Sequence, residues 1–246
     1  MRRFGVAIRF LTVLPTGPRG PVADADLGGS LLWFPLAGLA IGAILVIVHG
    51  LAARVLPPPA VGAMVVLAWV VVTGALHLDG LGDVCDGLYG ARAREERLRI
   101  MKDPHVGAMA VVGIATCLLM KFALVSSLST TLINQALLVV PCLGRYAMVL
   151  LATTLPSARG GEGTAAPFVK HGRKRSLVGA AVMALAASGA MLGLLGLALF
   201  GATLLAGLLM RSVFRRTLGG ITGDALGAVG EGTEVLALLA VSLARG

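Results

Sequence analysis

The sequence predicts an all-α, polytopic integral membrane protein: a helical bundle of about seven transmembrane helices with an N-terminal interfacial helix. Composition is the first reason, because 57% of the 246 residues are apolar, only 13% are charged, and the mean hydropathy is +0.91. Soluble domains are usually about 45–50% apolar and about 25% charged. The second reason is that uncharged runs long enough to cross a bilayer recur along the chain.

Charge and cysteine usage narrow the class further. The formal net charge is +9, but the basic residues lie in short runs between apolar segments. This distribution is typical of a membrane topology signal, so we expect a lipid bilayer and no nucleic acid as partner. The three cysteines are odd in number and form no CxxC pair, which argues against a disulfide framework or a zinc site. No repeat or second domain is evident, so residues 1–246 are expected to form a single membrane-embedded domain.

The first expected element is an interfacial helix over residues 1–14. On a helix, Phe4, Ile8 and Leu11 share one face, while Arg2 and Arg9 lie opposite. An apolar face backed by basic residues suits a helix that lies in the membrane interface. The alternative is a signal peptide, but no small-residue cleavage site follows the apolar stretch.

Six apolar runs follow, and the fifth of them is ambiguous. It covers residues 177–210 and contains no charge across 34 residues, which is long for one span and barely enough for two. Two short helices with a turn near Gly193 or Gly196 are the expectation, giving seven spans. The expected spans are residues 31–53, 60–78, 107–128, 132–153, the two parts of 177–210, and 224–243.

Charge distribution supports this count. With the N-terminus inside and seven spans, seventeen of the 21 Lys and Arg fall in cytoplasmic segments, as the positive-inside rule requires. A single span over 177–210 would instead place Arg211, Arg215 and Arg216 outside. The seventeen cytoplasmic residues are Arg2, Arg3, Arg9, Arg19, Arg92, Arg94, Arg97, Arg99, Lys102, Arg159, Lys170, Arg173, Lys174, Arg175, Arg211, Arg215 and Arg216.

A cluster of aspartates is the main functional signal. The chain has only seven Asp, and Asp79, Asp83 and Asp86 share one face if the second span continues as a helix. Like charges repel and are costly near a bilayer, so the grouping indicates a bound cation. Carboxylate oxygens suit Mg²⁺, which commonly also binds substrate phosphates. One carboxylate could instead accept a proton, and the structural alternative is a solvated helix end whose acids pair with nearby arginines.

Other polar residues near this cluster are weaker candidates. The basic run from Arg92 to Lys102 is either a topology signal or a clamp for an anionic substrate. Asp103 precedes Pro104 and could cap a helix that starts there. His77 could orient a ligand or be structural, and Asp224, flanked by glycines at the start of the last span, could cap that helix or face the first aspartates.

Ionisable residues also occur inside spans. Lys121 lies deep in its span, so pairing or packing is at least as plausible there as substrate contact. Arg145 is nearer the cytoplasmic end and either reaches a phosphate or has a structural partner. Glu231 and Glu234 either pair with these two cations or form part of a polar cavity.

The motifs together resemble cobalamin synthase, the membrane-bound adenosylcobinamide-GDP ribazoletransferase family. The resemblance rests on HLDGLGDVCDG at 77–87 and RIMKDPHVGAMAVVG at 99–113. Supporting matches are FLTVLP at 10–15, WFPLAGLAIG at 33–42 and GGITGDALGA at 219–228. They cover most of the chain in the expected order, and the combination is specific although each piece alone is weak.

The resemblance implies a reaction. The ribose hydroxyl of α-ribazole, or of α-ribazole 5′-phosphate, would attack the cobinamide-linked phosphorus of adenosylcobinamide-GDP. GMP would leave, and cobalamin or its 5′-phosphate would form with Mg²⁺ as cofactor. The motif positions carried over are Asp79, Asp83, Asp86, Lys102, Asp103 and Asp224.

Both lines of reasoning lead to one site hypothesis. Asp79, Asp83 and Asp86 would hold Mg²⁺, and one of them or Asp103 would help to deprotonate the attacking hydroxyl. Lys102, with one or more of the arginines Arg92, Arg94 and Arg145, would offset the diphosphate charge, and His77 and Asp224 are further candidate ligand-binding residues. We expect a bacterial inner-membrane enzyme whose site faces the cytoplasm. A homo-oligomer is left open.

Two alternatives compete with this interpretation. A CDP-alcohol phosphotransferase has a similar start to its motif, but here the Asp86–Arg92 stretch is one residue too long and the later G-x3-D-x3-D is missing. A cation-coupled transporter could use Asp79, Asp83 and Asp224, but transporters usually place their site near the midplane of the membrane and contain inverted repeats. Neither feature is expected here.

Overall fold

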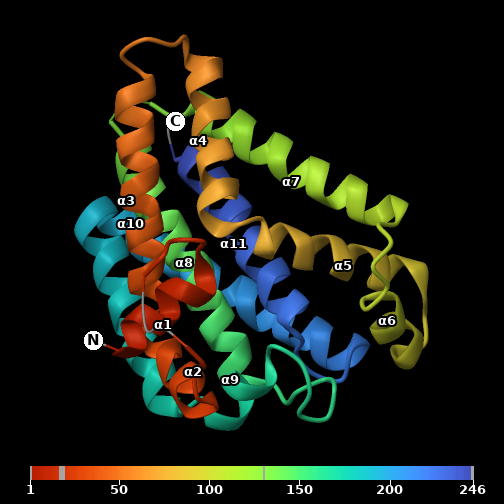
Figure 1. Ribbon diagram of the computed structural model, residues 1–246. Coiled ribbons are helices and arrows are strands. Elements are labelled where there is room, and N and C mark those ends of the chain that lie inside the picture. Colours follow the sequence, from red (N-terminus) through yellow and green to blue (C-terminus); the bar gives the residue numbers. More distant parts are fainter. Residues whose placement is uncertain (1, 17–19, 130, 245–246) are drawn as a thin grey trace.

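The computed structural model describes residues 2–16, 20–129 and 131–244, and this part of the chain is all-α (Figure 1). Arg19 and Arg245, which the topology argument counts, lie outside the described residues. The elements are α1 (Arg2–Leu11), α2 (Asp24–Ser30), the 3-10 helix η1 (Leu31–Trp33), α3 (Phe34–Ala52), α4 (Pro58–Thr73), α5 (Leu76–Gly90), α6 (Arg94–Ile100), α7 (Ala108–Ser127), α8 (Ile133–Thr154), α9 (Ala166–His171), α10 (Lys174–Thr217) and α11 (Gly223–Leu243).

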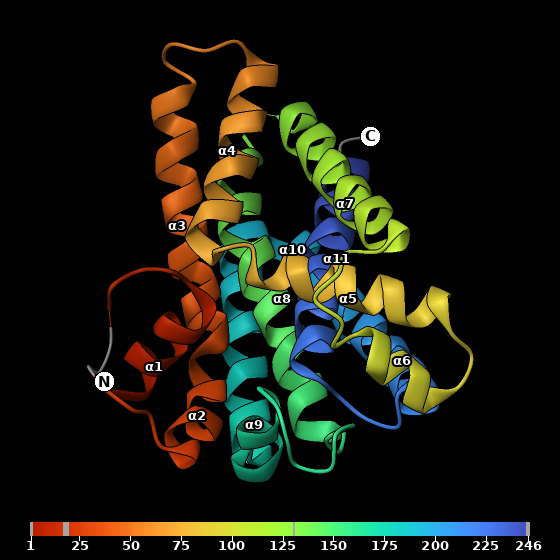
Figure 2. The same ribbon diagram turned by 45° about the vertical axis from the view of Figure 1, so that its right-hand side comes forward.

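Helix α8 forms the centre of the bundle and is surrounded by α3, α10 and α11 (Figure 2). It is buried almost throughout, whereas α7 and α10 expose most of their apolar surface. Close packing with α3 depends on Gly38 and Gly42, because a Cβ at either position would lie 2.5 Å from an α8 carbonyl oxygen. Large apolar side chains cover the outside of the bundle, including Ile47, Leu67 and Leu205, which fits contact with lipid.

In the described part of the chain, five helices are long and apolar enough to cross a membrane, or six if one bent pair counts as a span. That pair is α4 and α5, and it corrects the expectation of a continuous second span over 60–78. Helix α4 ends at Thr73, Gly74 and Ala75 both adopt left-handed conformations, and α5 leaves at 88° to α4. The predicted aspartates therefore lie on a separate helix that runs across the bundle (Figure 1).

Helix α10 contains the break expected near Gly193. This glycine has φ 58° and ψ −133°, a conformation that is essentially restricted to glycine. The chain turns back so sharply that a Cβ at Gly196 would lie 1.8 Å from the carbonyl oxygen of Ser188. Residues 174–217 nevertheless satisfy the length and hydropathy criteria as one segment, so the total of seven spans stays a prediction.

Helix α1 is amphipathic as expected. Val6, Ala7, Ile8 and Leu11 are buried, and the basic side chains face outward. Phe10 in the same helix has its ring 4.7 Å from that of Phe168 in α9. The pairing fixes α1 at the end of the bundle that holds α2 and α9, opposite the turn between α3 and α4 (Figures 1 and 2).

Candidate functional site

Helices α5 and α11 cross at van der Waals distance, and this crossing builds the site. A Cβ at Gly80 would lie 2.8 Å from the Cα atom of Asp224, and one at Gly227 would lie 2.9 Å from the carbonyl oxygen of His77. The two glycines thus allow the backbones to touch. As a result, Asp224 lies beside the α5 aspartates, although it is 138 residues or more away from them in sequence. It therefore faces the first aspartates, which is one of the two alternatives given for it.

The four carboxylates influence one another electrostatically. Asp83 is repelled by Asp224, Asp79 and Asp86, and the cationic neighbour that acts on it is Arg159. Arg159 also lies with its Nη2 3.4 Å from Asp224 Oδ2. Negative charge therefore exceeds positive charge at the crossing, which is the condition for attracting a cation.

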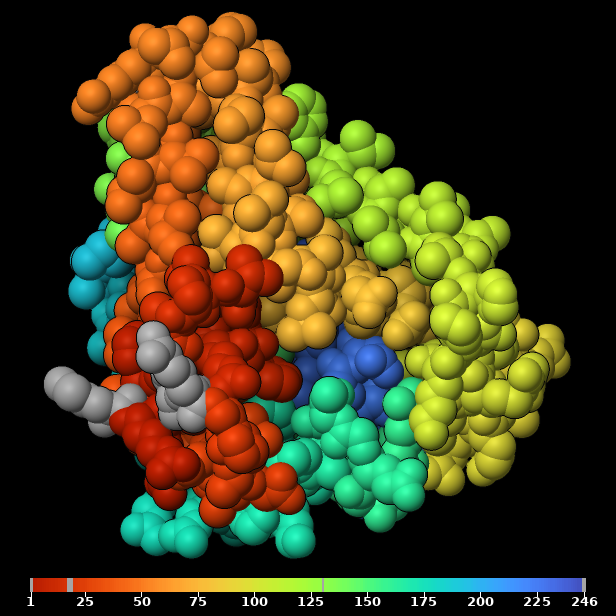
Figure 3. Space-filling view, viewed as in Figure 1, coloured from red at the N-terminus to blue at the C-terminus, as the bar shows by residue number. Residues whose placement is uncertain are grey.

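A hollow opens beside this crossing. In Figure 3 the surface of α11 is visible at its bottom, bordered by α1, α5 and the segment that follows α8. The cavity measures about 70 Å³, and His77, Asp79 and Asp224 line it. Phe10, which belongs to the FLTVLP motif, and Thr164, which no motif includes, also line it. Two of the four carboxylates are thus presented to a small space that is open to solvent.

Asp86 has a structural role that the sequence argument did not foresee. Its Oδ2 accepts a hydrogen bond of 2.7 Å from the Gly107 amide, and its Oδ1 accepts one of 2.9 Å from the Ala110 amide. These are orphan amides at the start of α7, so Asp86 caps that helix from another element. A Cβ at Gly107 would collide with this carboxylate.

The carboxylates at the α5–α11 crossing are compatible with a divalent cation that keeps part of its water shell. Within the described ranges, no group of three or more His, Cys, Asp or Glu side chains converges as a complete metal shell. Mg²⁺ does not require one, because it commonly keeps several waters and binds through one or two carboxylates plus substrate phosphates. Asp79 and Asp224, which both line the hollow, with Arg159 as the nearby cation, fit such an open site.

The second motif lies apart from the crossing. Lys102 and Asp103 are exposed in the loop between α6 and α7, and in the described part of the chain neither bonds to an α5 carboxylate. Helix α7 begins at Ala108, so the expectation that Asp103 caps a helix starting at Pro104 was wrong. Asp103 instead accepts a hydrogen bond from the His105 backbone N–H and lies 2.6 Å from His105 Nδ1. Both contacts lower the pKa of Asp103, which makes it a weak proton acceptor.

The basic residues of the α5–α6 region have divided roles. Arg92 is exposed and available to an anion. Arg94 donates 2.8 Å hydrogen bonds to the carbonyl oxygens of Leu218 and Ala158, so it fastens the end of α10 to the segment after α8. Arg97 donates to the Thr217 carbonyl oxygen in the same region. Arg94 and Arg97 therefore have structural roles, because their hydrogen bonds fix the segments that lie beside the hollow.

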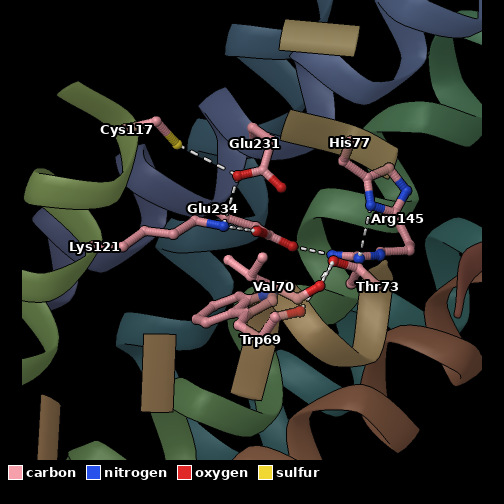
Figure 4. Close-up of polar contacts among 9 residues, drawn as sticks. All are labelled: Trp69, Val70, Thr73, His77, Cys117, Lys121, Arg145, Glu231 and Glu234. Atoms are coloured by element: carbon pink, nitrogen blue, oxygen red, sulfur yellow. Dashed lines mark hydrogen bonds and ion pairs between the residues drawn. The ribbon is translucent and has the colours of Figure 1, made fainter. Parts of the chain in front are cut away.

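Arg145 does not reach the site surface. It is buried, forms an ion pair with Glu234, and places Nη2 3.4 Å from His77 Nδ1 (Figure 4). Because its guanidinium is not exposed, Arg145 cannot contact a phosphate that arrives from solvent. Of the two alternatives for Arg145, the structure therefore shows the one with a structural partner. His77 is buried as well, but it lines the hollow and links it to Arg145.

Lys121, Arg145, Glu231 and Glu234 form what we call the charge cluster. Lys121 Nζ lies 2.7 Å from Glu231 Oε2 and also pairs with Glu234, and the ammonium group sits 4.3 Å from the centre of the Trp69 ring (Figure 4). Of the two alternatives left open for the glutamates, pairing with the two cations is the one that the structure shows. Two positive and two negative charges balance in an interior shielded from water.

Comparison with known proteins gives a consistent result. The family model described as cobalamin-5-phosphate synthase matches residues 3–242. A protein of Geotalea daltonii named adenosylcobinamide-GDP ribazoletransferase is 37% identical over 239 residues, which are 97% of this chain and 96% of the relative. A protein of the same name from Pseudomonas fluorescens is 39% identical over 249 residues, covering 99% of this chain and all of the relative. No solved structure matches the chain.

Proposed function

The chain belongs to the cobalamin-5-phosphate synthase family, and on this premise we propose that it joins adenosylcobinamide-GDP to α-ribazole or α-ribazole 5′-phosphate. It is a membrane transferase of the nucleotide-loop assembly step of cobalamin synthesis. This membership selects the transferase over a CDP-alcohol phosphotransferase and over a cation-coupled transporter.

The observation that carries the site assignment is the α5–α11 crossing. It brings Asp224 close enough to Asp79 and Asp83 to act on them electrostatically, although Asp224 is remote in sequence, and it presents Asp79 and Asp224 to the hollow. Phosphoryl transfer mainly requires positioning and neutralisation of charge, and carboxylates that hold a metal provide both. We therefore place the diphosphate of adenosylcobinamide-GDP over this crossing.

Mg²⁺ is the proposed cofactor, and Asp79, Asp83 and Asp224 would hold it. When bound, the ion would polarise the phosphorus and neutralise the departing GMP phosphate. Asp86, whose two oxygens already accept amide hydrogens, orients α7 against α5 and is a secondary candidate ligand. Arg159 is the first basic candidate for contact with the diphosphate because it already faces Asp224.

Proton transfer is assigned to an α5 carboxylate. The oxygen of the attacking hydroxyl forms a bond to the cobinamide-linked phosphorus, the bond from this phosphorus to the GMP oxygen breaks, and the hydroxyl proton passes to the carboxylate. Asp103 is less suited to this role because its contacts with His105 lower its pKa. Lys102 and Arg92 are exposed and are proposed to approach the diphosphate when substrate binds.

Placement in the bacterial inner membrane with the site facing the cytoplasm is part of the same proposal. The exposed apolar helices support a multi-pass membrane protein. The distribution of Lys and Arg favours an inside location for the loops that border the hollow. A cytoplasmic site would meet nucleotide-activated substrates directly.

The test uses the purified protein in nanodiscs with adenosylcobinamide-GDP and α-ribazole, and measures GMP release. Asp83→Asn is expected to lower turnover about 100- to 1000-fold with unchanged thermal stability, the scale of losing one electrostatic contact to a transition state. Glu95→Gln is the matched control, since that carboxylate is exposed on α6, and it should retain normal turnover. Near-normal turnover of Asp83→Asn would remove Asp83 from the site, and no GMP release by the folded wild type would refute the activity.

A separate arm concerns the metal. Chelation of divalent cations should stop GMP release, and added Mg²⁺ should restore it. Full turnover after exhaustive chelation would contradict the proposed cofactor while leaving the transferase activity intact.

A further inference from the structure

A second pocket with a basic lining lies away from the aspartate site. It is enclosed by α1, α2, α9 and the first turn of α10, and its volume is about 230 Å³. We call it the basic pocket. Its lining includes Arg3, Gly29, Lys170, His171, Arg173 and Ser176.

Two consecutive glycines in α2 bring the basic side chains together. A Cβ at Gly28 would lie 2.3 Å from the Cβ of His171, and one at Gly29 would lie 2.6 Å from the Arg3 guanidinium. Any larger side chain in α2 would push α1 or α9 away. The shape of the pocket therefore depends on the tertiary structure, since α9 packs there against α1 and α2 although it is remote from them in sequence.

The basic pocket carries more positive than negative charge. Among the cations that line the pocket, Arg3 forms an ion pair, with its Nε 3.6 Å from Asp26 Oδ1. Asp26 also pairs with Arg2 at 3.1 Å. Among the described residues, neither Lys170 nor Arg173 forms an ion pair. Asp26 thus compensates the charges of α1, and the cations of the α9–α10 segment remain available to a ligand.

The start of α10 adds to the attraction. Arg173 is its N-cap and supplies no side-chain cap, and the Ser176 amide donates to the Arg173 carbonyl oxygen at 2.8 Å. The amides of Lys174 and Arg175, which precede Ser176 in the first turn, are therefore the ones left to an anion. Helix N-termini favour phosphate groups through these amides and the helix dipole. Cations and a helix terminus around one small space therefore match a tetrahedral anion.

We propose that the basic pocket binds a phosphate group, supplied by the head group of an anionic phospholipid. Location supports the lipid source, because α1 is amphipathic and Arg3 belongs to it. Basic pockets beside membrane helices recognise anionic head groups, and each Lys or Arg near the surface contributes to that attraction. A soluble phosphate has the same chemistry and is distinguished by the experiment.

The test compares delipidated wild type with Lys170→Gln/Arg173→Gln. The control Arg215→Gln/Arg216→Gln removes two exposed charges at the other end of α10. Thermal unfolding is followed in neutral detergent with sodium phosphate or sodium chloride at equal ionic strength. It is repeated in nanodiscs of phosphatidylcholine alone or mixed with phosphatidylglycerol, and native mass spectrometry measures the retained phosphatidylglycerol.

The wild type and the control are expected to be stabilised by phosphatidylglycerol and to retain it, whereas the pocket variant should bind it about thirtyfold more weakly. If phosphate stabilises the wild type in detergent but phosphatidylglycerol neither stabilises it in nanodiscs nor is retained, the lipid source is refuted and a soluble phosphate remains. If the pocket variant responds like the control to both probes, the site itself is refuted. Arg3→Gln, measured in parallel, separates a binding defect from poor folding, because it should weaken binding while Arg2 still pairs with Asp26.

Discussion

Replacement of Glu234 by Gln is expected to destabilise the protein strongly, because it removes the carboxylate that the two buried cations share. Glu234 is fully buried and pairs with both Lys121 and Arg145. After the change, Lys121 keeps Glu231 at 2.7 Å, whereas Arg145 keeps only the His77 ring nitrogen at 3.4 Å. Arg145 then becomes a buried charge without a counterion.

The expected cost follows from that orphaned charge. Removal of one partner of a buried ion pair typically costs about 3–5 kcal/mol, since the remaining ion loses compensation it cannot obtain from water. Glu231→Gln should cost less, because Lys121 still faces Glu234. A double variant, Arg145→Met/Glu234→Leu, removes both charges and should recover most of the loss, as hydrophobic replacements of buried pairs are often neutral.

The assay is the free energy of unfolding of the purified protein in mixed micelles, obtained by denaturant titration and followed by circular dichroism. Adding the single variants Arg145→Met and Glu234→Leu to the wild type and the double variant completes a double-mutant cycle. A cost below about 1 kcal/mol for Glu234→Gln would refute the reasoning. A double variant no more stable than Glu234→Gln would show that packing, not charge pairing, dominates at this position.

Three further predictions concern backbone contacts. Asp86→Ala should cost about 1–2 kcal/mol and speed amide hydrogen exchange at Gly107, because the cap of α7 is lost. Gly80→Ala should lower turnover about 100-fold, since a methyl group 2.8 Å from Asp224 must displace α11 from α5. Gly193→Ala should cost about 1–3 kcal/mol in thermal unfolding, because the turn in α10 requires a conformation that alanine rarely adopts.

Gly201→Ala is the matched glycine control for the last two, since open space surrounds that position within a regular part of α10. It should be neutral or slightly stabilising. Unchanged turnover in Gly80→Ala would mean that the α5–α11 spacing does not position the carboxylates. Unchanged hydrogen exchange in Asp86→Ala would mean that water or another group caps α7 equally well.

Much of the candidate site was predictable because its signals are local. The Asp79, Asp83 and Asp86 spacing depends only on helical periodicity, and α5 is helical over this stretch. Likewise, Asp224 precedes an apolar span in a glycine-rich setting, and the cost of unpaired charge in a membrane made pairing one of the alternatives for Lys121. These inferences needed no knowledge of which helices are neighbours.

Other residues could not be placed in this way. Asp86 and Arg145 were both candidates for the site, yet one caps α7 and the other is buried against Glu234. The role of Arg159 was missed because a single arginine in a glycine-rich loop carries no distinguishing pattern. Only a contact with Asp224 identifies it.

Composition and periodicity act along the chain, so they were enough to predict a helical membrane protein with three aspartates grouped on one helix face. Tertiary structure alone decided how these parts meet. The bend after Thr73 and the glycine-mediated crossing at Gly80 and Gly227 set α5 against α11, and thereby place Asp224 beside Asp79 and Asp83. Two helices can approach this closely only where each carries a glycine opposite the backbone of the other. This match belongs to the pair of helices, so neither segment displays it alone.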